Sequence, residues 1–109
     1  MQLKNITPLI LTYNEAPNID RTLACLTWAS QIVVIDSFST DDTLAIVQRY
    51  PQVQVYQRVF DSFAEQCNFG LTHITTPWTL SLDADYQVSS TLVDEIRLLP
   101  DNPVVNGFR

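Results

Sequence analysis

Glycine is scarce in this sequence of 109 residues, which contains only Gly70 and Gly107. The glycine-rich dinucleotide fingerprint and the P-loop both need several glycines in one short segment, so that the backbone can approach a phosphate. The sequence therefore excludes both devices. A bound diphosphate would instead have to be held by a divalent cation on carboxylates.

Positive charge is also sparse, because six Lys and Arg residues oppose twelve Asp and Glu residues and the net charge is −6. This balance argues against nucleic acid or an anionic membrane surface as a partner. The two cysteines, Cys25 and Cys67, fall on apolar faces of expected helices and are interpreted as buried free thiols of a reducing compartment. No signal peptide or membrane-spanning run is visible, so we expect a cytoplasmic protein.

Four short apolar runs have the length and composition of buried strands. They cover residues 6–12, 31–36, 53–58 and 78–83. Pro8 is expected near the start of the first strand, because proline cannot donate to a central ladder. Val104 and Val105 are expected to begin one more strand.

Between these runs, apolar residues recur at helical spacing behind recognisable helix starts. The expected starts are Asn14 or Glu15 with Pro17 in the first turn, Ser39 with Asp42 at capping-box spacing, Ser62 with Glu65 at the same spacing, and Ser89 or Ser90. The side chains expected to face inward are Ile19, Leu23 and Leu26, then Leu44 and Val47, then Phe63, Cys67, Leu71 and Ile74, and finally Leu92, Ile96 and Leu99. Gly70 within the third helix either argues against a helix there, since glycine is a poor helix former, or marks close packing.

The alternation of strands and helices predicts an α/β fold, namely a single three-layer α/β/α domain with a mainly parallel, Rossmann-like sheet. Right-handed crossovers give the strand order 3-2-1-4. The chain then reverses direction between the first and fourth strands, and such sheets bind ligands in the crevice at that point.

Polar residues follow the strands that meet at this crevice. Asp83-Ala84-Asp85 ends the fourth strand, Thr12-Tyr13-Asn14-Glu15 ends the first, and Asp36 ends the second. We interpret Asp83 and Asp85 as holding a metal-bound nucleotide. Asp36 could accept a hydrogen bond from a base N–H, and Tyr13 could lie against the base or ribose. The alternative is that Asp83 caps a turn and Asp85 is merely solvated.

Three further groups have simpler interpretations. Arg58, at the end of the third strand, either reaches the phosphates or pairs with Asp61 on the surface. Asp41 and Asp42 are assigned to the start of a helix, where acidic side chains are favourable. His73, the only histidine, is expected near the end of the third helix without a metal role.

Taken together, three motifs resemble the family 2 glycosyltransferases of GT-A fold. They are Thr12-Tyr13-Asn14-Glu15, residues 35–43 (Ile-Asp-Ser-Phe-Ser-Thr-Asp-Asp-Thr), and Leu82-Asp83-Ala84-Asp85. The likeness is closer to bacterial cell-surface glucosyltransferases related to lipopolysaccharide core synthesis. The residues that share this closer likeness are Arg58, Phe60, Phe63, Ala64, Gln66 and Asn68.

The resemblance implies a nucleotide-diphosphate sugar as donor, a glycan or lipid-linked acceptor, inversion at the anomeric centre, and Mn²⁺ or Mg²⁺ as cofactor. Thr12, Tyr13 and Glu15 would line the nucleotide pocket, Asp36 would contact the base, and Arg58 would belong to the same nucleotide site. Asp83 would contact the ribose or metal, and Asp85 would be the principal metal ligand. The full enzyme would work in the cytoplasm, at the inner face of the cell membrane through peripheral association.

Two positions depart from this pattern. Tyr86 stands where an acidic residue is common in that branch, and Cys67 where a basic one is common. Members of the family also continue into an acceptor half that supplies the catalytic base. We therefore interpret residues 1–109 as the donor-binding part of a longer enzyme, with the general base outside it. An uncovered sheet edge would then favour self-association.

Other functions remain open at this point. A receiver-type phosphoacceptor domain binds Mg²⁺ at strand ends but needs a lysine at a late strand end, whereas Lys4, the only lysine, precedes the first strand. A haloacid-dehalogenase-like phosphatase needs its Asp-x-Asp after the first strand. A non-catalytic nucleotide-binding or purely structural α/β module is the remaining alternative.

Overall fold

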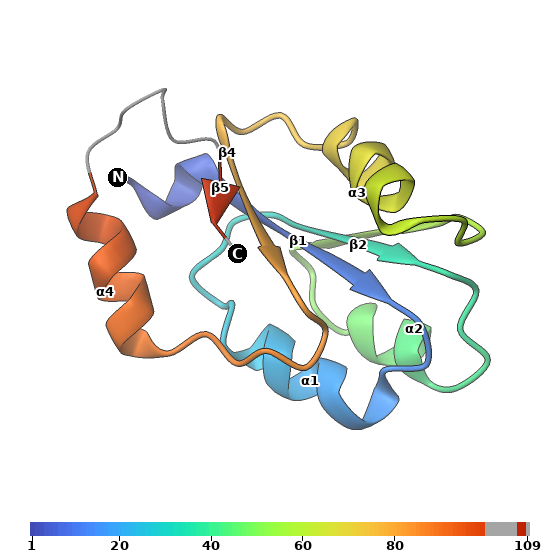
Figure 1. Ribbon diagram of the computed structural model, residues 1–109. Coiled ribbons are helices and arrows are strands. Elements are labelled where there is room, and N and C mark those ends of the chain that lie inside the picture. The colour runs from blue at the N-terminus through green and yellow to red at the C-terminus, as the bar shows by residue number, and fades with distance from the viewer. Residues whose placement is uncertain (100–106, 109) are drawn as a thin grey trace.

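The computed structural model describes residues 1–99 and the backbone of 107–108, which form a parallel sheet with helices on both faces (Figure 1). The strands are β1 (Ile6–Thr12), β2 (Ile32–Asp36), β3 (Val53–Gln57), β4 (Trp78–Leu82) and β5 (Gly107–Phe108), in the order β3-β2-β1-β4-β5. Each neighbouring pair is parallel. The predicted α/β fold and the order 3-2-1-4 are confirmed.

The helices cover the two faces of the sheet unequally. A 3-10 helix, η1 (Leu3–Asn5), precedes β1, and the α-helices are α1 (Ala16–Ala24), α2 (Thr43–Val47), α3 (Phe63–Leu71) and α4 (Ser90–Leu98). Side chains of α1, α2 and α4 share the larger core with one face of the sheet. Only a small cluster around Leu9, Val33 and Ile35 forms the core on the α3 side. Among the described helices, α3 alone therefore covers the second face (Figure 1).

The larger core contains most of the apolar residues expected to face inward. Ile19, Leu23 and Leu26 are fully buried, as are alternate residues of the central strands such as Ile6 and Ile10. Burial of these β-branched and leucine side chains provides the main stabilisation of the sheet, at about 1.5–3 kcal/mol for each fully buried side chain. Pro8 lies at the third position of β1, before the pairing of β1 with β2 begins at Leu9.

Three of the expected helix starts are confirmed, because α1 begins directly after Glu15 with Pro17 in its first turn. The Ser62 hydroxyl accepts a hydrogen bond from the Glu65 N–H at 3.1 Å, and the Ser89 hydroxyl accepts one from the Leu92 N–H at 3.0 Å. Each satisfies one of the amides that a helix leaves free at its beginning.

The capping box expected at Ser39 and Asp42 is wrong. Helix α2 begins later, at Thr43, and Asp42 makes no side-chain capping bond. The Ser39 hydroxyl donates instead to the Asp36 carboxylate at 2.5 Å. A buried carboxylate competes successfully for this hydroxyl because leaving it unpaired would be costly. Asp41 serves the helix start as expected, because its carboxylate accepts from the Thr43 N–H at 3.0 Å.

The inward face predicted for α3 is wrong at Phe63 and Leu71, although Ile74 packs on the core of the α3 side as expected. Phe63 and Leu71 are 72% and 46% exposed, whereas Gln66 and Gly70 are the buried residues of the helix. A Cβ at Gly70 would lie 2.5 Å from Leu9 Cδ1, so glycine allows this helix to lie directly on β1. Close packing at Gly70 is thus confirmed.

Other expectations need smaller corrections. Cys25 and Cys67 are free thiols but half-buried rather than buried. Strand β3 ends at Gln57 and β4 at Leu82, so Arg58 and Asp83 follow their strands instead of ending them. The strand expected from Val104 lies outside the described residues, although the backbone of β5 pairs with β4. None of the helices described is long and apolar enough to cross a membrane.

Candidate functional site

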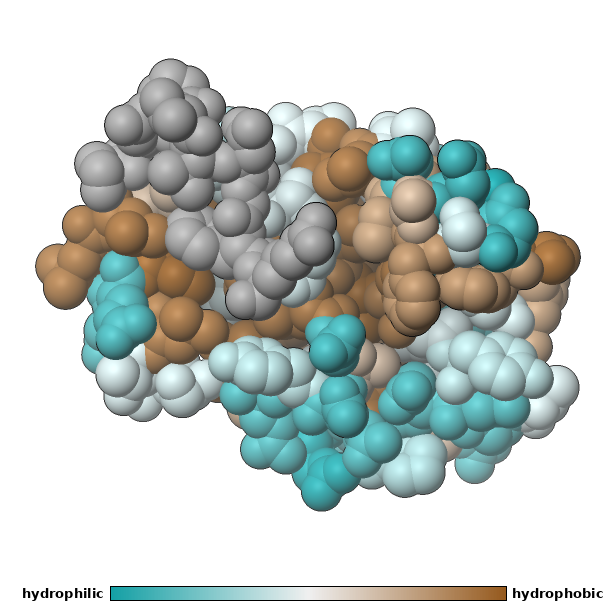
Figure 2. All heavy atoms as spheres, viewed as in Figure 1, coloured by the Kyte–Doolittle hydropathy of each residue, from teal (hydrophilic) through white to brown (hydrophobic). Residues whose placement is uncertain are grey.

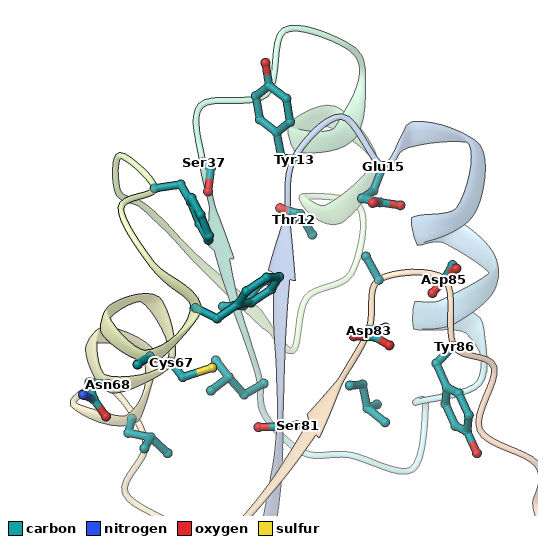
Figure 3. A pocket seen from close by; sticks show the side chains of 18 residues that line it. Thr12, Tyr13, Glu15, Ser37, Cys67, Asn68, Ser81, Asp83, Asp85 and Tyr86 are labelled. Atoms are coloured by element: carbon teal, nitrogen blue, oxygen red, sulfur yellow. The ribbon is translucent and has the colours of Figure 1, made fainter. Parts of the chain in front are cut away.

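A pocket of about 1070 Å³ opens on the α3 side of the sheet, where β1 and β4 end (Figure 3). Its lining comes from the end of β1, the residue after β2, the loop and helix of α3, and residues 81–86 of β4 and the following turn. This is the point where the chain reverses direction between β1 and β4. The crevice predicted from the strand order is therefore present.

The acidic residues of the pocket lie where β1 and β4 end. Glu15, Asp83 and Asp85 line it, and among the described residues no Lys, Arg or His does so. Asp83 and Asp85 are exposed, with the buried Ala84 between them. Within the same described part, neither carboxylate has a hydrogen-bond or ion-pair partner in the protein, so both are available to a ligand.

The backbone of the Asp-Ala-Asp segment is firmly anchored. The buried Thr22 hydroxyl donates to the Ala84 carbonyl at 2.6 Å, and the Tyr86 N–H donates to the Asp83 carbonyl at 3.0 Å. The turn is thus closed by backbone atoms, and the Asp83 carboxylate is not used to cap it. The capping role considered for Asp83 is therefore wrong, and the role of both exposed aspartates in ligand binding stays a prediction.

The carboxylates of the pocket suit a cation that is bound partly by the protein and partly by the ligand. No group of three or more His, Cys, Asp or Glu side chains gathers as a ready metal site within the described ranges. Mg²⁺ is commonly bound by one or two carboxylates, with water and substrate phosphates completing an octahedral shell. Asp83 and Asp85 fit a site of this kind and could hold Mn²⁺ or Mg²⁺ together with phosphate oxygens.

The predicted nucleotide residues at the end of β1 also line the pocket. Thr12 is buried and donates to Asp36 at 2.7 Å, Tyr13 is 58% exposed, and Glu15 is half-buried. Figure 3 shows Thr12 and Glu15 on the same side of the pocket as the two aspartates, with Tyr13 at the rim. The structure thus brings Thr12, Tyr13, Glu15, Asp83 and Asp85 together, and their contacts with a nucleotide stay predictions.

Asp36 lies beneath the pocket and does not line it. The residue is fully buried, and both carboxylate oxygens accept bonds from the protein. Oδ1 accepts from the hydroxyls of Thr12 at 2.7 Å and Ser39 at 2.5 Å, and Oδ2 accepts from the Ser39 N–H at 2.8 Å. A contact with a nucleotide base stays a prediction and would have to displace one of these bonds.

Arg58 is held away from the pocket. Its guanidinium pairs with Asp61 at 2.8 Å, donates to Gln66 Oε1 at 2.9 Å, and lies over the ring of Phe69. The bond from Arg58 holds the pKa of Asp61 below its ordinary value, and the same bond raises the pKa of Arg58. Of the two roles considered for Arg58, the structure shows the pair with Asp61.

Sequence reasoning missed the apolar wall of the pocket, which we define as Phe60, Phe63, Cys67 and Leu71. These residues line the pocket from the α3 side, with Phe60 and Phe63 packed edge to face at 5.4 Å between ring centroids. Figure 2 shows apolar atoms gathered in the recess between α3 and β4, and Figure 3 places Cys67 across the pocket from Asp83. The four-residue spacing of positions 63, 67 and 71 is the sequence signal for this wall, although the same spacing also fits a helix face packed on the core.

Comparison with known proteins agrees with this arrangement. The model of the family described as glycosyl transferase family 2 matches residues 9–102. An uncharacterised glycosyltransferase of Rickettsia felis is 32% identical over 98 residues, which is 89% of this chain and 34% of that protein. The lipopolysaccharide core biosynthesis glycosyltransferase LpsC of Rhizobium meliloti is 29% identical over 95% of this chain and 40% of its own length.

A further relative is also named a glycosyltransferase. The SPbeta prophage-derived glycosyltransferase SunS of Bacillus subtilis is 34% identical over 73% of this chain and 20% of its own length. The chain thus spans about a third of the length of the first curated relatives that it matches. Fold, pocket position, motifs and family model agree, and the chain belongs to glycosyl transferase family 2.

Proposed function

We propose that this chain is the donor-binding part of a glycosyltransferase and that it binds a nucleotide-diphosphate sugar through Mn²⁺ or Mg²⁺. The observation that carries the proposal is the charge of the pocket. Its described lining has three carboxylates and no basic side chain. Two like charges about 4 Å apart repel by roughly 1 kcal/mol in water and about 4 kcal/mol near a protein surface. A diphosphate beside Asp83 and Asp85 therefore needs a cation between the negative groups.

The residues of the pocket then take distinct roles. Asp85 is the principal metal ligand, and Asp83 binds the metal or the ribose. Thr12, Tyr13 and Glu15 bind the nucleotide, with the Tyr13 ring against the base or ribose. A bound cation would stabilise the charge that develops on the departing diphosphate. No residue of the described part is assigned as the general base.

Asp36 and Arg58 need a change of partners to join this site. Asp36 would have to exchange one of its bonds from Thr12 or Ser39 for a base N–H. Arg58 would have to leave Asp61 to reach a phosphate. We keep both as proposed nucleotide contacts that depend on such a rearrangement.

The acceptor and the cellular location are proposed from the relatives. LpsC is named for lipopolysaccharide core biosynthesis, which supports a cell-surface glycan or lipid-linked acceptor for this protein as well. An inverting transfer in the cytoplasm, with the full enzyme on the inner face of the membrane, is consistent with that acceptor.

The geometry does not favour a receiver-type phosphoacceptor. Such a domain needs an accessible aspartate, whereas Asp36 is fully buried here. Lys4 lies in η1, before β1, and not at the end of a late strand. A non-catalytic nucleotide-binding module would have the same pocket. An assay for sugar transfer distinguishes it from an enzyme. We expect residues 1–109 alone to bind the donor without meaningful transfer.

Calorimetry tests the proposal. The chain is titrated with several nucleoside diphosphates, with Mn²⁺ or with a chelator, and the same titrations are made with Asp85→Asn. We expect binding only with the metal and a loss of at least about tenfold in the variant, which corresponds to about 1.4 kcal/mol. Asp42→Asn is the matched control, since Asp42 is exposed and makes no capping bond. Equal binding in the chelator, or no binding of any nucleoside diphosphate, would refute the proposal.

A further inference from the structure

The loop after β1 is held by side chains of the loop after β2 and of Thr43, the first residue of α2. Three consecutive amides, those of Asn14, Glu15 and Ala16, donate to the side chains of Ser39 at 2.8 Å, Thr43 at 2.9 Å and Asp41 at 3.2 Å respectively. Helix α1 has no side-chain cap of its own at Glu15. The amides at its start are therefore satisfied from a neighbouring loop, and the position of the first loop depends on that of the second.

Asn14 makes this attachment reciprocal. Its side-chain oxygen Oδ1 accepts from the Thr40 N–H at 2.8 Å and from the Asp41 N–H at 3.3 Å. Its own N–H donates to the Ser39 hydroxyl. Backbone and side chain of one residue thus bind three successive residues of the opposite loop.

Ser39 connects this contact to a buried anchor. Its hydroxyl accepts from Asn14 and donates to Asp36 Oδ1, so its single proton and one of its two lone pairs are used. The Ser39 N–H donates to the other carboxylate oxygen of Asp36 at 2.8 Å. Because Asp36 is fully buried, its demand for donors fixes Ser39, and Ser39 in turn fixes Asn14.

The backbone shows that both loops are constrained. Among the described residues, the two non-glycine residues with positive φ are Asn14 at 52° and Phe38 at 58°, one in each loop. Asparagine tolerates this left-handed region, but phenylalanine does not do so readily. Such conformations persist only where the surroundings hold them, and they often mark functional sites.

We infer that Asn14 and Ser39 are positioning residues that lock the two loops together and so hold Tyr13 and Glu15 at the pocket. Neither Asn14 nor Ser39 lines the pocket, whereas the residues on both sides of Asn14 do. The inference rests on the proposed function, because the ligand that benefits from this positioning is the nucleotide. Asn14 and Ser39 would thus contribute to nucleotide binding through Tyr13 and Glu15, without touching the substrate themselves.

Two variants at position 14 separate positioning from simple stability. Asn14→Gly keeps the left-handed backbone and removes the side-chain oxygen, whereas Asn14→Asp keeps both the conformation and an acceptor oxygen. We expect Asn14→Gly to bind nucleoside diphosphates with Mn²⁺ about fivefold or more weakly, and Asn14→Asp to recover most of that loss. Hydrogen exchange of the Thr40 and Asp41 amides should accelerate in the glycine variant and slow again in the aspartate variant.

Ser39→Ala gives a second, independent test. Removal of the hydroxyl should weaken the binding of nucleoside diphosphates with Mn²⁺ and accelerate hydrogen exchange of the Asn14 amide, because that N–H loses its acceptor. Variants that bind as tightly as the wild type, or an Asn14→Asp variant that recovers no affinity, would overturn the inference. A wild-type chain that binds no nucleoside diphosphate would instead refute the proposed function, and the positioning role with it.

Discussion

Replacing Gly70 with alanine tests how closely α3 lies on the sheet. The added Cβ would be 2.5 Å from Leu9 Cδ1 and 3.2 Å from both Leu9 Cδ2 and Ile35 Cγ1, whereas carbon atoms pack best at about 3.5–4.0 Å. Leu9 is only 2% exposed and has little room to move. Overpacking of this kind destabilises the fold by about 1–3 kcal/mol. The better helix propensity of alanine stabilises it by about 1 kcal/mol. We expect a net destabilisation of about 1 kcal/mol.

Urea unfolding measures this change from the shift of the midpoint at constant slope. A double-mutant cycle with Leu9→Val identifies the contact, because the smaller side chain makes room for the new methyl group. In that background Gly70→Ala should be neutral or stabilising, with a coupling of about 1–2 kcal/mol. If Gly70→Ala stabilised the otherwise unchanged chain by about 1 kcal/mol, helix propensity alone would account for the change in stability. The close packing of α3 on Leu9 would then be refuted.

Three further predictions concern charge, access and assembly. The Thr43 hydroxyl holds the pKa of Asp41 below its ordinary value of 3.8, so the stability gained from Asp41 is present above pH 3.8 and lost as the pH falls through the lowered pKa. When urea unfolding is repeated at decreasing pH, the free energy of unfolding should fall less steeply in Asp41→Asn than in the wild type. Asp42→Asn should behave like the wild type. A metal–nucleotide complex at ten times its dissociation constant should slow alkylation of Cys67 about tenfold; mass spectrometry should show no such protection of Cys25, which lines a separate groove. The exposed apolar wall should favour self-association, and a monodisperse monomer by light scattering at high concentration would contradict this.

The sheet could be predicted from the sequence because its signals are local and strong. The runs that became β1, β2 and β4 are short and apolar, and handedness of the crossovers left one arrangement for them. Once the order was known, the meeting of Glu15, Asp83 and Asp85 at one edge followed from topology alone. Capping at Ser62 and Ser89 was equally local, because it depends on residues three positions apart.

The errors occurred where a local pattern depends on a distant partner. Periodicity shows that positions 63, 67 and 71 form one apolar face of α3, but it does not show whether that face meets the sheet or a pocket. Ser39 has a capping-box spacing to Asp42, yet Asp36 takes its hydroxyl. Glutamine is a residue type that is mostly exposed, yet Gln66 is fully buried and bonds Ser37 and Arg58. In each case the deciding contact comes from another element of the fold.

The central place of β1 in the sheet has a consequence for how the chain is made. β2, which pairs with one edge of β1, leaves the ribosome soon after it, whereas β4, which pairs with the other edge, begins only at Trp78. At typical rates of synthesis, that second edge stays unpaired for on the order of several seconds. During this interval the nascent chain carries an open hydrophobic strand, which is a target for chaperones and for misassembly with neighbouring chains. Both acidic side chains of the Asp-Ala-Asp segment emerge after that interval, so the pocket that they line cannot form until β4 has been made.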